Sequence, residues 1–311
     1  MKPATSPDAR GPALLVVQTS FLGDVVLTTP LVSALRRRLA PRRLRAERFE
    51  VAVSPHRSLR TALLLAAAGI PRRVGFRESR GARLFHERVP RDRGRHDVER
   101  NLALLAPFGG GEAEPPPLHV PIAPEAPGRA AALLPPGAGP LVGVAPGSVW
   151  TTKRWAPEGF AAVIGALAAE GARCVVLGAP EDAALAAEIN HRAGGCATVL
   201  AGRTDLPTMV AVVDRLALLI ANDSAPMHIA CARGVPVVAV FCATTPALGY
   251  GPWGPRTTVV EADLACRPCG RHGGRRCPRG TDDCMRLVPP AAVLAAARAA
   301  LGTTAGAAAV R

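Results

Sequence analysis

The residues best suited to chemistry lie in three short loops, each directly after an apolar run that predicts a buried β-strand. The loops occupy residues 19–30, 145–155 and 222–228, and each leads into a stretch with helical spacing. Ligands of parallel α/β sheets bind beyond the carboxyl ends of the strands. These loops are therefore the first candidates for a binding site.

In the first loop, Gly23 allows a ligand to approach the backbone closely, and Asp24 stands at the start of the predicted helix. An aspartate at this position commonly caps the helix. The local pattern alone favours that structural role.

The second loop has the composition of a phosphate-binding site. Ser148, Thr151, Thr152 and Lys153 precede a predicted helix, and helix N-termini and backbone N–H groups favour anions. Lys153 is unusual because the chain has 36 arginines and only one other lysine. The alternative is that Lys153 is a solvent-exposed cation without a role.

The third loop combines an acid with a helix start. Ser224 is a good N-cap with Pro226 just inside the helix, so the helix end can face a pyrophosphate. Asp223 can accept hydrogen bonds from sugar hydroxyls, and His228 lies within reach of a phosphate. A single histidine at this place is more often structural.

Predicted strands and helices alternate in both halves of the chain, which indicates parallel sheets with right-handed crossovers. The strands are predicted at residues 13–18, 50–53, 71–76, 87–90, 141–145, 174–177, 198–200, 216–221 and 237–241. The helices are predicted at residues 24–39, 57–68, 97–105, 157–170, 181–193, 206–214 and 227–233.

A Pro- and Gly-rich zone at residues 107–140 separates the two halves. We expect an α/β protein with two Rossmann-like domains facing across a cleft. The expected parts are a first domain at 11–125, a linker at 126–140 and a second domain at 141–302, with a Cys-rich loop at 266–284.

The composition excludes several classes of protein. The chain of 311 residues is long enough for two domains, and 49% hydrophobic residues suit a globular fold. Aromatic residues, at 4%, are too few for a single-strand nucleic-acid binder that stacks bases. Residues 1–12 lack an apolar signal core and no apolar run is long enough to span a bilayer, so we expect a cytoplasmic protein.

The formal net charge of +14 is uneven, because residues 1–120 carry +10 of it. A basic region of this kind suits a phosphorylated partner or an anionic lipid leaflet. The compositional bias toward arginine explains the charge equally well.

Together, the three loops resemble glycosyltransferase family 9, the bacterial ADP-heptose:lipopolysaccharide heptosyltransferases. The resemblance rests on Gly-Asp-Val-Val-x-Thr-x-Pro from Gly23, Pro-Gly-Ser and Lys-x-Trp from Pro146, and Asn-Asp-Ser-x-x-x-His from Asn222. The order and spacing match over nearly the whole chain. The resemblance implies a GT-B fold, with the acceptor on the first domain and ADP-heptose on the second. It also implies an inverting, metal-independent transfer with no essential cofactor, and the chain has no Asp-X-Asp sequence to hold a metal on a diphosphate.

The resemblance also implies a role for each matching residue. Asp24 would be the general base that deprotonates the acceptor hydroxyl, with a late proton transfer because a helix N-terminus favours the charged carboxylate. On the donor side, Lys153, Thr151 and Thr152 would hold the diphosphate together with Ser148. Asp223 would bind heptose hydroxyls, Ser224 and His228 the phosphates, and Met227 belongs to the same donor side. Either Glu181 or Asp182 would bind the adenosine ribose.

The implied acceptor is the lipid A–Kdo–heptose core of lipopolysaccharide, which requires peripheral contact with the cytoplasmic leaflet of the inner membrane. The acceptor candidates are Gly23, His56, Arg57, Ser58 and Arg60, although an exposed basic helix start explains the last four nearly as well. After the Arg-rich run at 36–48, the first domain lacks a strand–helix segment that the family usually has, so it is shortened. That loss leaves open whether the first domain is active.

The second half also contains a cysteine cluster. Its members, with the spacing Cys-x2-Cys-x7-Cys-x6-Cys, are Cys266, Cys269, Cys277 and Cys284. In a cytosolic chain this spacing predicts a metal site before disulfides, although it fits zinc patterns only loosely. Bound metal, redox activity and plain reduced thiols all stay open, and a structural role is favoured over a catalytic one. A comparable element occurs in heptosyltransferase II-like sequences, which favours transfer of the second heptose.

Two alternatives remain from the sequence. One is a GT-B glycosyltransferase with another donor or another acceptor, in capsule, O-antigen or protein. The other is a basic, non-enzymatic nucleic-acid binder, which the ordered motifs and the few aromatic residues oppose. We therefore expect no nucleic-acid partner.

Overall fold

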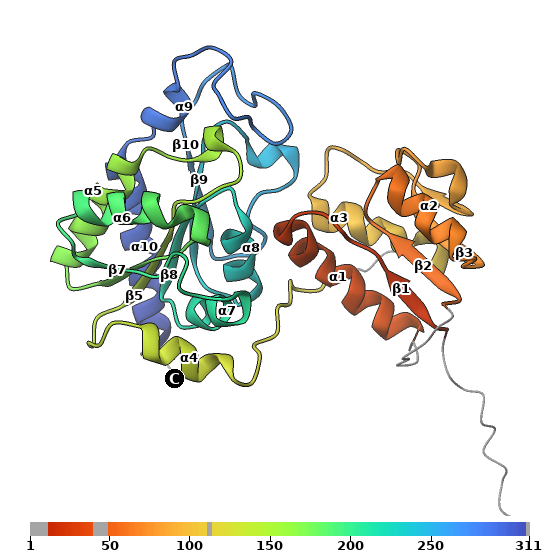
Figure 1. Ribbon diagram of the computed structural model, residues 1–311, viewed down its shortest axis with the longest axis horizontal. Helices are drawn as coiled ribbons and strands as arrows, with labels where there is room; N and C mark the ends of the chain where they lie inside the picture. Colours follow the sequence, from red (N-terminus) through yellow and green to blue (C-terminus); the bar gives the residue numbers. More distant parts are fainter. Residues whose placement is uncertain (1–11, 40–48, 111–113, 309–311) are drawn as a thin grey trace, which may run out of the picture. The chain divides into compact units, whose positions relative to one another are not determined.

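The computed structural model describes residues 12–39, 49–110 and 114–308, and it divides into two compact units at Leu118 and His119 (Figure 1). Each unit contains one parallel sheet, as the alternating pattern predicts. Residue 11 and most of the Arg-rich run, residues 40–48, lie outside the described residues. Within the described ranges, no helix has the length and apolarity needed to cross a bilayer.

The predicted linker at 126–140 contains helix α4 (Ala126–Leu133), which belongs to the second unit. Arg129 on α4 donates from Nε to Thr208 Oγ1 at 2.9 Å, and Thr208 lies on α7 (Leu206–Asp214). Helix α4 is therefore packed on α7 within the second unit.

The first unit is built on four parallel strands in the order β1-β2-β3-β4, so neighbours in the chain are neighbours in the sheet. The strands are β1 (Leu14–Val16), β2 (Val51–Ser54), β3 (Arg72–Phe76) and β4 (Glu87–Val89). The helices are α1 (Leu22–Leu39), α2 (Leu59–Ala67) and α3 (Asp97–Leu102), with 3₁₀ helices η1 (Ala82–Leu84) and η2 (Ala103–Phe108). These strands and α-helices confirm the predicted ones, with ends that shift by a few residues.

A buried ionic network fixes α3 against α1. Asp97 is 4% exposed and pairs with the Arg91 guanidinium and, at 3.5 Å, with Arg100 Nη1. Asn101 donates from Nδ2 to Asp97 Oδ2 at 3.3 Å and to the Leu27 carbonyl of α1 at 3.4 Å. Because removing one partner of a buried ion pair costs about 3–5 kcal/mol, such a network strongly favours one arrangement of the two helices.

The second unit contains a six-stranded parallel sheet in the order β10-β9-β8-β5-β6-β7. The strands are β5 (Leu141–Ala145), β6 (Arg173–Val176), β7 (Ala197–Val199), β8 (Leu218–Asn222), β9 (Val237–Phe241) and β10 (Thr257–Glu261). The chain builds the sheet outward from β5 through β6 to β7, and then returns to place β8 on the other side of β5. The junction of β5 and β8 is a topological switch point, where ligands of such sheets bind.

Two helical layers cover this sheet (Figure 1). One layer contains α5 (Pro157–Ala169), α6 (Ala183–Arg192) and α10 (Pro290–Ala308), and the other contains α4, α7 and α8 (Ala225–Ala232). Between the first layer and the sheet lies a core that includes Trp155, Phe160 and Ile164, each at most 2% exposed. The indole Nε1 of Trp155 donates to the Val288 carbonyl at 3.1 Å, so the only polar atom of this side chain is satisfied.

Candidate functional site

Three loops meet at the carboxyl edge of the second sheet, after β5, β8 and β9. The register pairs Ala145, the last residue of β5, with Ala221, the last but one of β8, so the two loops begin within one residue of the same level. The candidate site is therefore built at the switch point of this unit.

The side chain of Asn222, the last residue of β8, binds the segment that follows β5. Asn222 is fully buried, and its Nδ2 donates to the Pro146 carbonyl at 2.6 Å. Its Oδ1 accepts from the Trp155 backbone N–H at 3.0 Å. One amide thus holds both ends of the segment that carries Lys153. Sequence reasoning gave Asn222 no role of its own, although a buried polar residue at a strand end was a usable signal.

Lys153 and Asp223 come from different loops and form an ion pair, with 2.6 Å between Nζ and Oδ2. Their side chains are 13% and 7% exposed. The Thr244 hydroxyl, from the loop after β9, donates to the same carboxylate oxygen at 2.7 Å. An ammonium group has three donors, so one carboxylate does not exhaust it. The arrangement presents a fixed cation for an anionic ligand, beside a carboxylate suited to hydroxyl groups.

The other predicted phosphate-binding residues surround this pair in unequal ways. Thr151 is exposed, whereas Thr152 is 3% exposed, and both lie in the 3₁₀ helix η3 (Thr151–Lys153). The Ser148 carbonyl accepts from Arg154 Nε and Nη2 at 2.9 and 2.6 Å, which closes the loop on itself. The binding roles of these hydroxyl groups stay predictions.

Helix α8 starts behind Asp223. Ser224 occupies the predicted N-cap position, but its hydroxyl donates to the Asn222 carbonyl at 3.3 Å and does not cap the helix. His228 is 4% exposed, and Met227 is fully buried in the core. Met227 therefore lies behind the site, and a ligand contact by its side chain stays a prediction.

The two ribose candidates differ in their surroundings. Both lie in the 3₁₀ helix η4 (Pro180–Asp182) after β6. Asp182 accepts from the Ala179 N–H at 3.1 Å and lies 3.7 Å from Arg154 Nη2. A Cβ added to Gly147 would meet Asp182 Oδ2 at 2.3 Å, so this carboxylate packs directly on the loop after β5. Glu181 is exposed.

In the first unit, Asp24 lies in the first turn of α1 and its Oδ2 accepts from the Phe21 N–H at 3.2 Å. Because α1 begins at Leu22, Asp24 is the third residue of the helix and not its N-cap, and it stabilises the helix start by binding the N–H of the residue before the helix. Its role as a base stays a prediction.

The first unit also joins the loops after β1 and β2. His56 Nδ1 lies 2.9 Å from Thr19 Oγ1 and 2.8 Å from Thr61 Oγ1. Burial first, and then the charge of Arg57, lowers the pKa of His56, so the ring is neutral at physiological pH. Ser58 caps α2 by accepting from the Arg60 N–H at 3.2 Å. Two acceptor candidates, His56 and Ser58, thus already have structural partners.

The four clustered cysteines give no metal geometry. Among the residues that the structure describes, no three His, Cys, Asp or Glu side chains are placed to hold a metal ion. Burial first, and then neighbouring thiols, raises the pKa of Cys284 to about 11. A metal at Cys266, Cys269, Cys277 and Cys284 stays a prediction from spacing alone.

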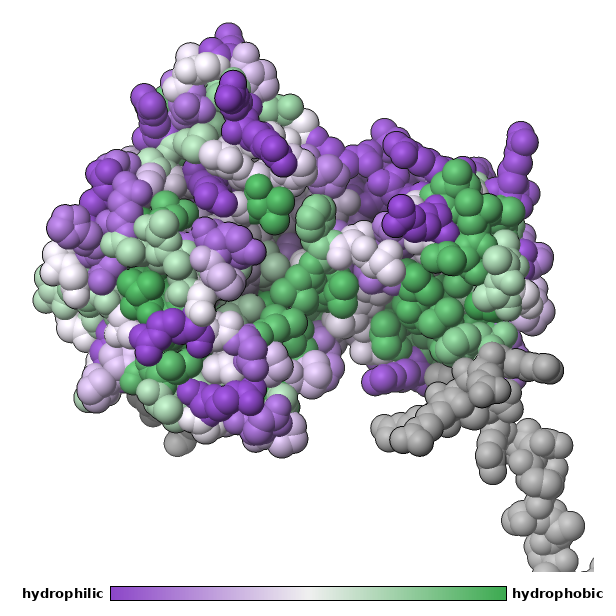
Figure 2. All heavy atoms as spheres, in the orientation of Figure 1, coloured by the Kyte–Doolittle hydropathy of each residue, from purple (hydrophilic) through white to green (hydrophobic). Residues whose placement is uncertain are grey.

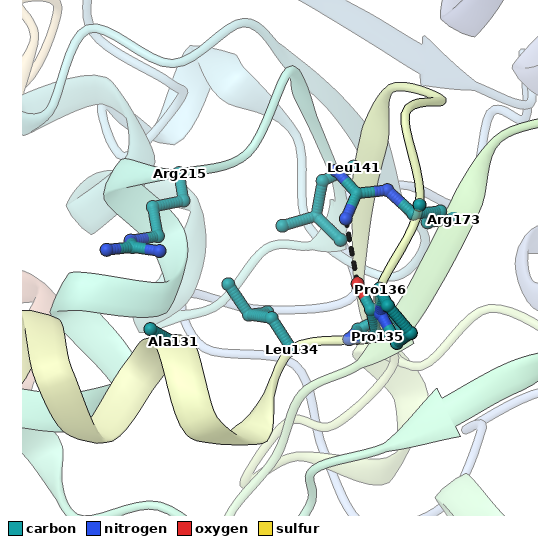
Figure 3. Close-up of a pocket in the computed structure, with 8 residues that line it drawn as sticks. Ala131, Leu134, Pro135, Pro136, Leu141, Arg173 and Arg215 are labelled. Carbon is teal, nitrogen blue, oxygen red and sulfur yellow. Dashed lines mark hydrogen bonds between the residues drawn. The ribbon is translucent and has the colours of Figure 1, made fainter.

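A cavity of about 460 Å³ lies at the other edge of the second sheet (Figure 3). It is lined by α4 and by the first residues of β5 and β6, Leu141 and Arg173, with Arg215 on the facing side. Arg173 Nη1 donates to the Pro135 carbonyl at 2.7 Å. Since this edge holds the amino ends of the strands, the cavity is separate from the candidate site.

Comparisons with known proteins agree with the geometry. The sequence profile described as "Glycosyltransferase family 9 (heptosyltransferase)" matches residues 36–276. Lipopolysaccharide heptosyltransferase 3 of Escherichia coli is 39% identical over 105 residues, which are 32% of this chain and 30% of that protein. Lipopolysaccharide heptosyltransferase 2 of Salmonella typhimurium is 31% identical over 225 residues, or 68% of this chain and 64% of that protein. The matched regions thus span less than two thirds of these relatives.

Solved structures share the fold. A glycosyl transferase of family 9 from Veillonella parvula has a TM-score of 0.79 at 22% identity, over 94% of this chain and 97% of that one. ADP-heptose lipopolysaccharide heptosyltransferase II of E. coli has a TM-score of 0.74 at 21% identity, over 93% and 98%. The expected GT-B fold is confirmed, and the chain belongs to glycosyltransferase family 9, the heptosyltransferases.

Proposed function

We propose that this protein is an inverting glycosyltransferase that moves L-glycero-D-manno-heptose from ADP-heptose to the inner core of lipopolysaccharide, as the second heptose. The observation that carries the proposal is the Lys153–Asp223 ion pair. It lies at the topological switch point of a parallel α/β sheet, the place where such sheets bind nucleotides. Family membership supports the reaction class, and the names of the relatives support the heptose donor.

The chemistry of the pair suits the departure of ADP. As the glycosidic bond to the diphosphate breaks, negative charge develops on the leaving oxygen. The Lys153 ammonium, held by Asp223, stabilises that charge without first being ordered, and the N-terminus of α8 adds a favourable dipole. Asp223 in turn accepts hydrogen bonds from heptose hydroxyls.

Asp24 is the proposed base that takes the acceptor proton. Its position at the helix start stabilises the carboxylate and makes it a weak base. The proton therefore moves late, after the acceptor oxygen has largely bonded to the sugar and has become acidic. Inversion follows from this single displacement.

We expect Asp24→Asn to lower turnover about 10²–10⁴-fold, the usual contribution of a general base. Turnover is measured as ADP release from ADP-heptose that depends on a truncated core acceptor carrying one heptose. The asparagine oxygen can still accept from the Phe21 N–H, so the helix cap is preserved and ADP-heptose affinity should stay within about twofold.

Near-wild-type turnover in Asp24→Asn would remove Asp24 from the role of base. Tight ADP-heptose binding by the wild type with no acceptor-dependent release would contradict the proposed acceptor. The role of Asp24 as the base and the identity of the acceptor are thus tested by different outcomes.

We propose Glu181 as the ribose ligand, because Asp182 is engaged with Ala179, Arg154 and the loop after β5. An exposed carboxylate after β6 is suited to the two vicinal hydroxyls of a ribose.

We expect Glu181→Gln to weaken ADP binding about tenfold, since a hydrogen bond to a charged group contributes about 1.5–3 kcal/mol. Its affinity for 2′,3′-dideoxy-ADP should equal that of the wild type, because this nucleotide lacks the hydroxyls. Asp182→Asn is the matched control, and we expect it to lower the melting temperature while still discriminating ADP from dideoxy-ADP. Calorimetric titration checks both variants, and the opposite pattern would assign the ribose to Asp182.

We propose peripheral membrane contact through α2, next to the lipid-linked acceptor. Leu59, Leu63 and Leu64 on this helix are 46%, 51% and 64% exposed, and Arg57 and Arg60 lie beside them in sequence. Figure 2 shows hydrophobic side chains gathered on the first unit. Apolar side chains flanked by arginines suit the surface of an anionic leaflet.

Leu64→Glu is expected to reduce partitioning onto phosphatidylglycerol-containing vesicles at least about tenfold, because burying a leucine contributes about 1.5–3 kcal/mol. Vesicle sedimentation measures this partitioning. The matched control is Leu206→Glu, at a leucine of the second unit that is 46% exposed. An equal loss in both variants, or no loss in either, would contradict the proposed face.

A further inference from the structure

The Cys-rich loop at 266–284 contacts the candidate donor site at its middle. The Gly274 carbonyl accepts from the Thr152 N–H at 3.1 Å and from the Thr152 hydroxyl at 3.0 Å. The Gly274 N–H donates to the same hydroxyl at 2.8 Å. The hydroxyl of a 3%-exposed threonine thus both donates to and accepts from a residue 122 positions away.

Gly273 packs on the stem of Lys153. It has φ of +73°, a conformation that favours glycine. A Cβ at this position would lie 3.0 Å from Thr152 Oγ1 and 3.2 Å from Lys153 Cγ. The backbone of the loop therefore packs directly against the first carbons of the lysine side chain. A larger residue at position 273 would displace that side chain.

The first residues of the same loop bind the segment after β9, which in turn contacts Asp223, the other partner of the ion pair. The Arg267 side chain is 4% exposed and donates to the Phe241 and Thr244 carbonyls at 3.0 and 2.7 Å. The Cys269 N–H donates to the Ala243 carbonyl at 2.9 Å. These bonds fix the loop after β9, and the Thr244 hydroxyl in that loop donates to Asp223.

We propose that the Cys-rich loop is a positioning element of the donor site, in which Gly273 and Gly274 hold Lys153 in place for the diphosphate. The inference rests on the proposed function, because it assigns the purpose of Lys153 to the donor. In this role the Cys-rich loop packs on η3 and keeps Lys153 from moving away from Asp223. The role does not require the cysteines to bind a metal. A flexible lysine would otherwise lose rotamer freedom on binding, which lowers affinity.

The test compares two glycines of the same loop. Gly280 has φ of +71°, close to that of Gly273, but a Cβ there meets no atom within 4 Å. Gly273→Ala and Gly280→Ala therefore introduce similar backbone strain, and only Gly273→Ala pushes on Thr152 and Lys153. We expect Gly273→Ala to weaken ADP binding at least tenfold by calorimetric titration, and Gly280→Ala to change it less than twofold.

Two readouts separate positioning from general destabilisation. Adenosine has no phosphate, so its affinity should be unchanged in Gly273→Ala. In a Lys153→Met background, Gly273→Ala should cost little further ADP affinity, because the two changes remove the same interaction. If Gly273→Ala does not fold, Arg267→Lys takes its place. A lysine cannot make the several bonds of the guanidinium, and the same loss of ADP selectivity over adenosine is expected.

Equal effects of the two glycine variants, an equal loss of adenosine affinity, or additive losses with Lys153→Met would each overturn the inference while leaving the proposed function intact. Absence of ADP binding by the wild-type protein would overturn both.

Discussion

The candidate donor site depends on one buried amide, the side chain of Asn222. It accepts from the N–H of Trp155 and donates to the carbonyl of Pro146, so the loop after β5 is closed onto the end of β8. An apolar residue there would leave a buried N–H and a buried carbonyl unsatisfied, at about 1–3 kcal/mol each. The strand order that brings β8 beside β5 makes the contact available, and the contact gives the segment between Pro146 and Trp155 its shape.

The ion pair between Lys153 and Asp223 is supported by several neighbouring segments. Asp223 forms an ion pair with Lys153 and accepts a hydrogen bond from the Thr244 hydroxyl, and these two partners come from different loops. A weakly exposed ion pair gains from low solvent screening, but it is retained only when its geometry is supported. Here the support comes from three strands and from the Cys-rich loop, through Gly274 and Thr152. The ion pair is therefore preorganised, as the proposed binding of a diphosphate requires.

Much of this arrangement was predictable from sequence, for reasons that differ between residues. The ends of β5 and β9 match the predicted ones because each is an unbroken apolar run preceded by proline. Strand β10 and helix α10 were not predicted, since β10 is a partly exposed edge strand and α10 is so rich in alanine that it shows little apolar periodicity. The loops that bear Lys153 and Asp223 were predicted, but their contact required the position of β8. Thr244 lies outside every recognised motif, and Gly274 lies within the cysteine cluster but was given no role of its own. Only the three-dimensional structure therefore reveals their contacts with Asp223 and Thr152.

The most direct test of the central claim, that Lys153 at this switch point binds the diphosphate of an adenine nucleotide, is calorimetric titration of wild type and Lys153→Met with ADP, UDP and GDP. The wild type should bind ADP in preference to the other two nucleotides. Lys153→Met should lose about 10- to 150-fold in ADP affinity, the equivalent of about 1.5–3 kcal/mol for a charged hydrogen bond. Equal ADP affinity of the two proteins would contradict the account.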